Sequence, residues 1–127
     1  MQLIPKNIRL YNQALEIIEL SRSIATYMAY DLNQLDANGK EQLSIYHTGD
    51  IIRQSDALAP QIIAAENQIL LDKRIEHAHS LQQITQKLLK TCERLEEAQS
   101  NARDFIALLR KELRIFKRLQ KTWVLSL

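Results

Sequence analysis

Hydrophobic residues recur along most of this chain at steps of three and four, which is the spacing of one face of an α-helix. The pattern predicts four amphipathic helices, at about residues 7–32, 41–66, 72–98 and 102–123. The first of them is long and carries two stripes, one through Ile8, Tyr11, Leu15, Ile18 and Ala25 and the other through Leu10, Ala14, Ile17, Ile24 and Met28.

The breaks between these segments are short and polar. Residues 36–40 (DANGK) contain the Asn-Gly pair that is typical of a turn, and they connect the first two helices. Pro60 lies inside the second segment, where proline removes a hydrogen bond, so we expect a kink or a restart near Leu58. Asp72 is a suitable N-cap for the third helix, and Ser100 with Asn101 for the fourth.

Four helices of this length with short connections can bury their stripes against one another. We therefore predict an all-α fold, an antiparallel up-and-down four-helix bundle, in a single domain over residues 1–127. The composition agrees with this prediction, because 46% of the residues are hydrophobic and there are only two Gly and two Pro to form the turns of an all-β fold.

Composition also bears on the compartment. Cys92 is the single cysteine, so it has no partner for an internal disulfide, and we expect a reducing, cytoplasmic location. The N-terminal residues lack the apolar run of a signal peptide, and no stretch approaches the roughly 18 apolar residues of a membrane span. We expect no membrane partner.

Positive charge is concentrated in the last predicted helix. Residues 101–121 hold seven cations and two carboxylates, a net charge of about +5, whereas the whole chain is +2, so the remainder is about −3. At about 100° per residue, all seven cations fall on the side opposite the apolar stripe. They are Arg103, Arg110, Lys111, Arg114, Lys117, Arg118 and Lys121.

A run of charge is often only a solvated helix face. Seven like charges on one face nevertheless repel one another, and no glutamate is interleaved on that face to form stabilising pairs. We therefore predict an anionic partner for this face. The candidates are the phosphates of RNA or DNA, an acidic protein, or the acidic patch of another copy of this chain, formed by Glu93, Glu96 and Glu97.

Two charged residues interrupt apolar stripes. Glu112 lies near the middle of the apolar face of the last helix, and Arg22 interrupts the stripe of the first helix between Ile18 and Ala25. Because an unpaired buried charge is costly, we predict that Arg22 and Glu112 form an ion pair inside the bundle or at a subunit contact. The alternative is that both side chains reach the edge of the bundle and remain in water.

Metal and cofactor chemistry is not indicated. His47, His77, His79 and Cys92 do not have the spacing of a zinc site, because residues two apart on a helix point in nearly opposite directions. The sequence contains no glycine-rich phosphate loop and no serine with a recognisable catalytic base. We predict no metal, no cofactor and no catalytic residue.

One short motif suggests an alternative. In RIEHAH, Arg74 and His79 stand five residues apart, which resembles the arginine-to-histidine motif of the HEPN family of small helical ribonucleases. The resemblance implies RNA cleavage by these two side chains, usually across a dimer interface.

A second resemblance covers two blocks. IRQSDALAPQIIAAEN, which ends at Asn67, resembles the signature of the four-helix-bundle proteins encoded in bacterial rRNA intervening sequences, with matches at Arg53, Pro60, Ile63 and Ala64. SLQQITQKL resembles a second block of that family, with matches at Ser80, Leu81 and Leu88.

In architecture that family also resembles the accessory variability determinant of diversity-generating retroelements, small basic four-helix bundles that form a pentameric barrel and bind nucleic acid and a reverse transcriptase. The resemblance implies an oligomeric, non-enzymatic bundle with a basic surface. The apolar tail WVLSL, with Trp123, Val124, Leu125 and Leu127, is a candidate oligomer contact or a part of the chain's own core.

These observations together predict a non-enzymatic, homo-oligomeric accessory protein that binds an RNA or DNA backbone through its last helix, with a reverse transcriptase as a candidate partner. The alternatives are a HEPN-like ribonuclease that uses Arg74 and His79, and a purely structural protein-interaction module.

Overall fold

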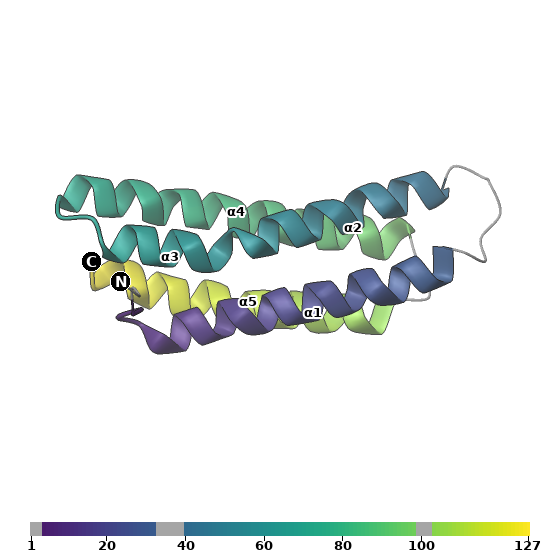
Figure 1. Cartoon of the computed structure of the whole chain (residues 1–127), viewed down its shortest axis with the longest axis horizontal. Helices are drawn as coiled ribbons and strands as arrows, with labels where there is room; N and C mark the ends of the chain where they lie inside the picture. Colours follow the sequence, from purple (N-terminus) through teal and green to yellow (C-terminus); the bar gives the residue numbers. More distant parts are fainter. Residues whose placement is uncertain (1–3, 33–39, 99–102) are drawn as a thin grey trace.

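The computed structural model describes residues 4–32, 40–98 and 103–127, and every regular element in these ranges is an α-helix. The helices are α1 (Ile8–Leu32), α2 (Lys40–Asp56), α3 (Leu58–Glu66), α4 (Leu71–Ala98) and α5 (Arg103–Leu125). Because α2 and α3 follow each other along one arm, five helices form four arms (Figure 1). The prediction of an all-α four-helix bundle is confirmed.

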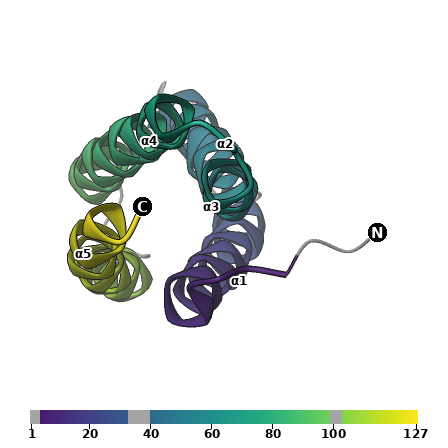
Figure 2. The same cartoon turned by 90° about the vertical axis from the view of Figure 1, so that its left-hand side faces the viewer.

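The arms pack around a shared interior. Figure 2 shows them from one end, with α4 next to the arm of α2 and α3 on one side and next to α5 on the other. α1 closes the ring, since it packs against α2, α3 and α5. Contacts between α1 and the second arm run in opposite order along the chain: the Lys6 N–H meets Glu66, whereas Ser21 meets Ser55. The same inverse order relates α4 to α5, as the contacts described below show.

The core is one cluster of buried apolar side chains from all four arms. Of the two stripes of α1, the core uses the one formed by Leu10, Ala14, Ile17, Ile24 and Met28, all fully buried. The other stripe lies at the rim, where Tyr11 and Ile18 are half-buried and Ile8 and Leu15 are exposed. From α5 the core receives Ile106, Leu109, Leu113, Phe116 and Trp123.

The expected restart near Leu58 is confirmed. α2 ends at Asp56, the Ala57 N–H bonds to the carbonyl of Gln54, and α3 begins at Leu58. Pro60 is therefore the third residue of a new helix. In a first turn the backbone N–H groups have no intrahelical acceptor, so proline loses no hydrogen bond there.

The start of α1 is fixed by a buried carboxylate from another arm. Glu66, at the end of α3, accepts hydrogen bonds from the backbone N–H groups of Lys6 (2.9 Å) and Asn7 (3.0 Å). The Asn7 side chain accepts the N–H of Leu10 at 3.0 Å, which makes Asn7 the N-cap of α1. A third donor to Glu66 is the indole N–H of Trp123 from α5 (3.0 Å). One side chain thus ties three arms together at one end of the bundle.

The expectation for Asp72 needs correction, because α4 begins one residue earlier, at Leu71, and Asp72 lies in its first turn. A negative charge still suits that position. The predicted turn residues 36–39 and the predicted caps Ser100 and Asn101 lie outside the described residues. Across the ranges that the structure covers, no helix combines the length and the apolar character that a membrane crossing requires.

Candidate nucleic-acid interface

α5 is strongly amphipathic, and its two faces are cleanly separated. Its buried face supplies the core residues given above, while six of the seven predicted cations lie on its exposed face. These six, here called the basic row, are Arg103, Lys111, Arg114, Lys117, Arg118 and Lys121. Within the described part of the chain, none of the six forms an ion pair.

Arg110 does not belong to the basic row. Its Nη1 lies 2.9 Å from Oε2 of Glu96 on α4, and both side chains are mostly covered, with 32% and 21% of their surface exposed. Position 110 is at the edge of the buried face of α5, directly against the last part of α4. Glu96 belongs to the acidic patch that the sequence suggested as a partner on another copy. In the structure it pairs with Arg110 of the same chain.

A groove of about 490 Å³ runs between α4 and α5 beside the basic row. The α5 wall consists of Arg114, Lys117, Arg118 and Lys121, and the α4 wall of Gln82, Thr85 and Gln86. No carboxylate is among the described residues that line it. Four of the predicted cations thus share one concave surface, whereas Arg103 and Lys111 lie outside it.

The floor of this groove contains a polar group with spare hydrogen-bonding capacity. Gln120 is only 2% exposed, and its Oε1 lies 3.3 Å from the hydroxyl of Thr85, which also donates to the carbonyl of Leu81. Its Nε2 has no partner among the described residues. Turning the amide around would leave the oxygen without a partner instead, so one end of this buried amide is unpaired in either orientation. Sequence reasoning missed Gln120, although a polar residue on the apolar stripe of the last helix marks it.

The predicted ion pair between Arg22 and Glu112 is not formed within the chain. Arg22 is exposed and lies 3.3 Å from Asp56 at the end of α2. Glu112 is half-buried and accepts a 2.6 Å hydrogen bond from the Gln13 side chain, which also reaches the Glu112 carbonyl at 3.0 Å. Within one chain the pair does not form because Glu112 lies opposite residue 13 of α1, whereas Arg22 lies more than two turns further along that helix. A pair at a subunit contact stays a prediction.

The arginine and histidine of the ribonuclease-like motif do not come together. The Arg74 Nη1 donates to the carbonyls of Gln68 (3.0 Å) and Ile69 (2.9 Å), where it closes the turn between α3 and α4. His79 is exposed, and its Nε2 lies 3.3 Å from the Gln83 side chain on its own helix. His77 is directed toward α3, with its Nδ1 3.0 Å from Gln61. Within one chain, Arg74 and His79 therefore do not pair with each other.

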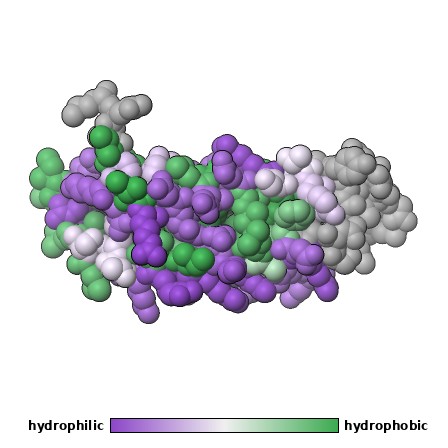
Figure 3. All heavy atoms as spheres, turned by 90° about the horizontal axis from the view of Figure 1, so that it is seen from below, coloured by the Kyte–Doolittle hydropathy of each residue, from purple (hydrophilic) through white to green (hydrophobic). Residues whose placement is uncertain are grey.

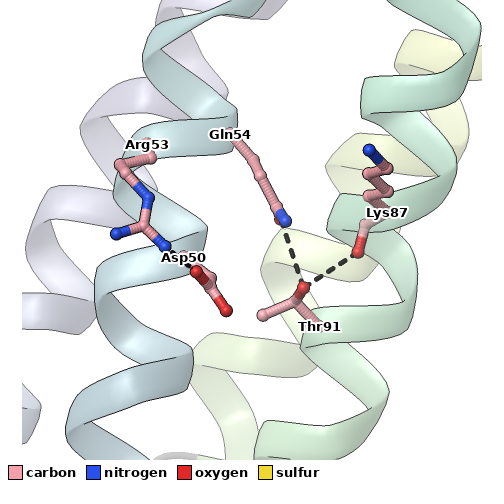
Figure 4. Close-up of polar contacts among 5 residues, drawn as sticks. All are labelled: Asp50, Arg53, Gln54, Lys87 and Thr91. Carbon is pink, nitrogen blue, oxygen red and sulfur yellow. Dashed lines mark hydrogen bonds and ion pairs between the residues drawn. The ribbon is translucent and has the colours of Figure 1, made fainter.

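The blocks of the second resemblance supply contacts between arms as well as contacts within one helix. Figure 4 shows the Thr91 hydroxyl of α4 donating to the carbonyl of Lys87 (2.9 Å) and lying 3.2 Å from Oε1 of Gln54 on α2. Arg53, one of the matching residues, forms an ion pair with Asp50 of its own helix. Arg53 is on a different arm from the basic row.

Cys92 is fully buried between α4 and the core. Burial, together with the nearby Glu96 carboxylate, raises the pKa of its thiol from 9.0 to about 12. The thiolate, which is the form that acts as a nucleophile or metal ligand, is therefore strongly disfavoured near neutral pH. Within the described ranges, no three His, Cys, Asp or Glu side chains gather closely enough to hold a metal ion.

Comparison of the chain with protein families, with curated proteins and with solved structures gave no match.

Proposed function

We propose that this chain is a non-enzymatic accessory protein that binds the phosphate backbone of RNA or DNA through α5. The surface is the α4–α5 groove, with Arg114, Lys117, Arg118 and Lys121 as phosphate contacts and Arg103 and Lys111 as weaker, outlying ones. A cytoplasmic protein that oligomerises and works beside a reverse transcriptase, as the resemblance implies, would have use for such a surface.

One observation carries this proposal: four cations line one groove to which the described chain contributes no carboxylate. Like charges held this close raise the free energy of the folded state unless an anion neutralises them. The contrast with Arg110 supports this reasoning, since that cation does have a carboxylate partner at 2.9 Å. An anion that meets four cations at once must itself carry several charges.

The dimensions suit a few consecutive phosphates. Residues 114 and 121 are seven positions apart, which corresponds to about 10 Å along the helix axis. Contacts from flexible cations to a phosphate backbone carry no sequence information. We therefore expect binding with little dependence on sequence. The exposed amides of Gln82 and Gln86 on the α4 wall are the uncharged groups that could reach a base or a sugar.

The experiment is a binding titration with a fluorescently labelled oligonucleotide over a salt series. Four neutralised phosphates give a slope of log affinity against log salt of up to about −3.6 on duplex DNA and about −2.8 on a single strand. The double variant Arg114→Glu/Lys117→Glu should weaken binding at least tenfold.

A matched control has the same change in charge elsewhere. Lys87 and Lys90 are exposed on α4 and do not line the groove, so Lys87→Glu/Lys90→Glu should weaken binding much less. Equal losses in the two double variants would mean attraction by net charge alone, and absence of binding at about 50 mM salt would reject the proposal outright.

A further inference from the structure

Large apolar side chains are exposed at one end of the bundle. Ile69 and Leu125 are almost fully exposed, at 91% and 89%, and four neighbouring residues are between 44% and 60% exposed. We call the six together the apolar end: Ile8, Ile69, Leu70, Leu71, Ile75 and Leu125. They come from the start of α1, the turn between α3 and α4, the first turns of α4 and the last residue of α5.

These segments lie at the same end because Glu66 holds them there. Its carboxylate bonds to the start of α1 and to Trp123 near the end of α5, while Glu66 itself precedes the turn that contains Ile69. In Figure 1 the C-terminus and the turn between α3 and α4 are both at the left-hand end. Figure 3 shows hydrophobic atoms along that same left-hand edge.

The apolar end is comparable in size with the largest apolar patch of a typical monomer. At these exposures, six leucine and isoleucine residues present on the order of several hundred Å² of apolar surface. The largest patch on a typical monomer is about 300–600 Å² and is often functional. Each partner in a standard protein interface contributes about 800 Å². The apolar end would therefore form the centre of such an interface, and the charged side chains around it would form the rim.

The charges around the apolar end nearly cancel. Its rim holds four cations, Lys6, Arg9, Lys73 and Arg74, and two exposed carboxylates, Asp72 and Glu76, while the carboxyl group of Glu66 is buried beneath it. Lys73 and Glu76 pair with each other at 3.3 Å, and Arg74 is bound to carbonyls of the turn. A charged partner would gain little here. An apolar patch with a balanced rim is complementary to an identical patch, as a two-fold symmetric contact requires.

We propose that two copies of this chain associate end to end through the apolar end. A lateral contact over the basic row of α5 is less favourable, because it would place two sets of cations against each other. The end-to-end contact removes the most exposed apolar side chains of the molecule from water and leaves both grooves open. It does not depend on nucleic-acid binding.

Light scattering coupled to size exclusion, followed by small-angle X-ray scattering, tests this arrangement. One chain has a mass of 14.8 kDa, so the expected particle has twice that mass. α4 has 28 residues and is about 42 Å long, so an end-to-end dimer should reach a maximum dimension of roughly 85 Å. A side-by-side dimer would remain near the length of one bundle.

The decisive variant is Ile69→Asp/Leu70→Asp, because both residues lie in the exposed turn and outside the core. It should keep its helical circular dichroism and weaken dimerisation by at least about tenfold. The control is Leu15→Asp/Leu108→Asp, whose 41% and 44% exposed side chains lie on α1 and α5 away from this end. It should remain dimeric.

Three results would overturn the inference. They are a monomeric wild-type chain at high micromolar concentration, a dimer whose maximum dimension is that of a single bundle, and loss of the dimer in the control but not in the decisive variant. A complex formed only with another protein or with lipid vesicles would likewise replace the second copy as the occupant.

Discussion

The indole N–H of Trp123 donates a 3.0 Å hydrogen bond to Oε2 of Glu66, and both side chains are buried. The same carboxylate receives the backbone N–H groups of Lys6 and Asn7. Because one carboxyl group accepts all three hydrogen bonds, it holds the start of α1 against the last turns of α5.

Removal of the Glu66 carboxylate should be among the most destabilising single changes outside the apolar core. In Glu66→Ala three N–H donors lose their acceptor. The buried Trp123 donor costs about 1–3 kcal/mol when left unsatisfied, and the part-buried N–H groups of Lys6 and Asn7 cost less, so we expect a loss of about 2–3 kcal/mol in the free energy of unfolding. Urea denaturation followed by circular dichroism measures it. Glu76→Ala, which removes one partner of an exposed ion pair, should cost less than about 1 kcal/mol. Equal losses of unfolding free energy in the two variants would show that Glu66 does not hold the arms together.

Arg110 and Arg114 should separate stability from binding. Arg110→Ala breaks a largely covered ion pair and should lower the free energy of unfolding by about 1 kcal/mol, with the salt dependence of nucleic-acid binding unchanged. Arg114→Ala should leave stability within about 0.5 kcal/mol and make the duplex salt slope about 0.9 less steep. Denaturation and binding titrations on both variants test the pair. A reversed outcome would assign the phosphate contact to Arg110.

Cys92 should be unreactive in the folded protein. With its pKa raised to about 12 by burial and by Glu96, alkylation by iodoacetamide should proceed only as fast as the chain opens. Mass spectrometry after timed quenching, with a urea-unfolded sample as the reference, measures this rate. Fast modification of the native protein would show that the thiol is accessible.

The same group adds a pH dependence at alkaline pH. The unfolded thiol ionises near 9.0 and the folded thiol near 12, so the folded state binds more protons between these values. This contribution to stability is complete below pH 9 and is lost as the pH rises toward 12. Because lysines and tyrosines also titrate there, the comparison is with Cys92→Ala, whose unfolding free energy should fall less steeply over the same range.

Double-mutant cycles should locate the partner of Glu112. The Gln13 side chain donates to it at 2.6 Å, so Gln13→Ala and Glu112→Ala should show a coupling of about 0.5–1.5 kcal/mol. Arg22→Ala combined with Glu112→Ala should be additive within about 0.5 kcal/mol, because Arg22 pairs with Asp56 instead. Coupling between Arg22 and Glu112 would revive an ion pair between subunits.

Periodicity predicted the helices well because it is a local property. Each helix repeats every 3.6 residues whatever it packs against, so the predicted bounds lie within two residues of those observed. The helix restart before Pro60 could also be predicted from the sequence, since it follows from the missing N–H of one residue. The separation of cations from apolar residues on α5 follows from the same local rule.

The side-chain pairs between helices could not be predicted from periodicity. Whether Arg110 meets Glu96, or Glu112 meets Gln13, depends on the register of one arm against another, which the packing of the whole core sets. Pattern alone also did not separate the two stripes of α1, because both contain enough apolar residues to face a core. Glu66 showed no sign in the sequence of being buried, since its three donors lie 57 to 60 positions away along the chain.

Because the two faces of α5 are separated, the stability of this helix should depend on the concentration of polyanions in solution. The side of this helix that carries Phe116 and Trp123 packs into the core. On the opposite side, the cations of the basic row repel one another. A bound polyanion would reduce this repulsion. Inorganic polyphosphate alone should therefore raise the melting temperature and slow amide hydrogen exchange along the last four turns of the chain. In the cell, α5 would then open least often where polyphosphate or nucleic acid is abundant and most often where it is scarce.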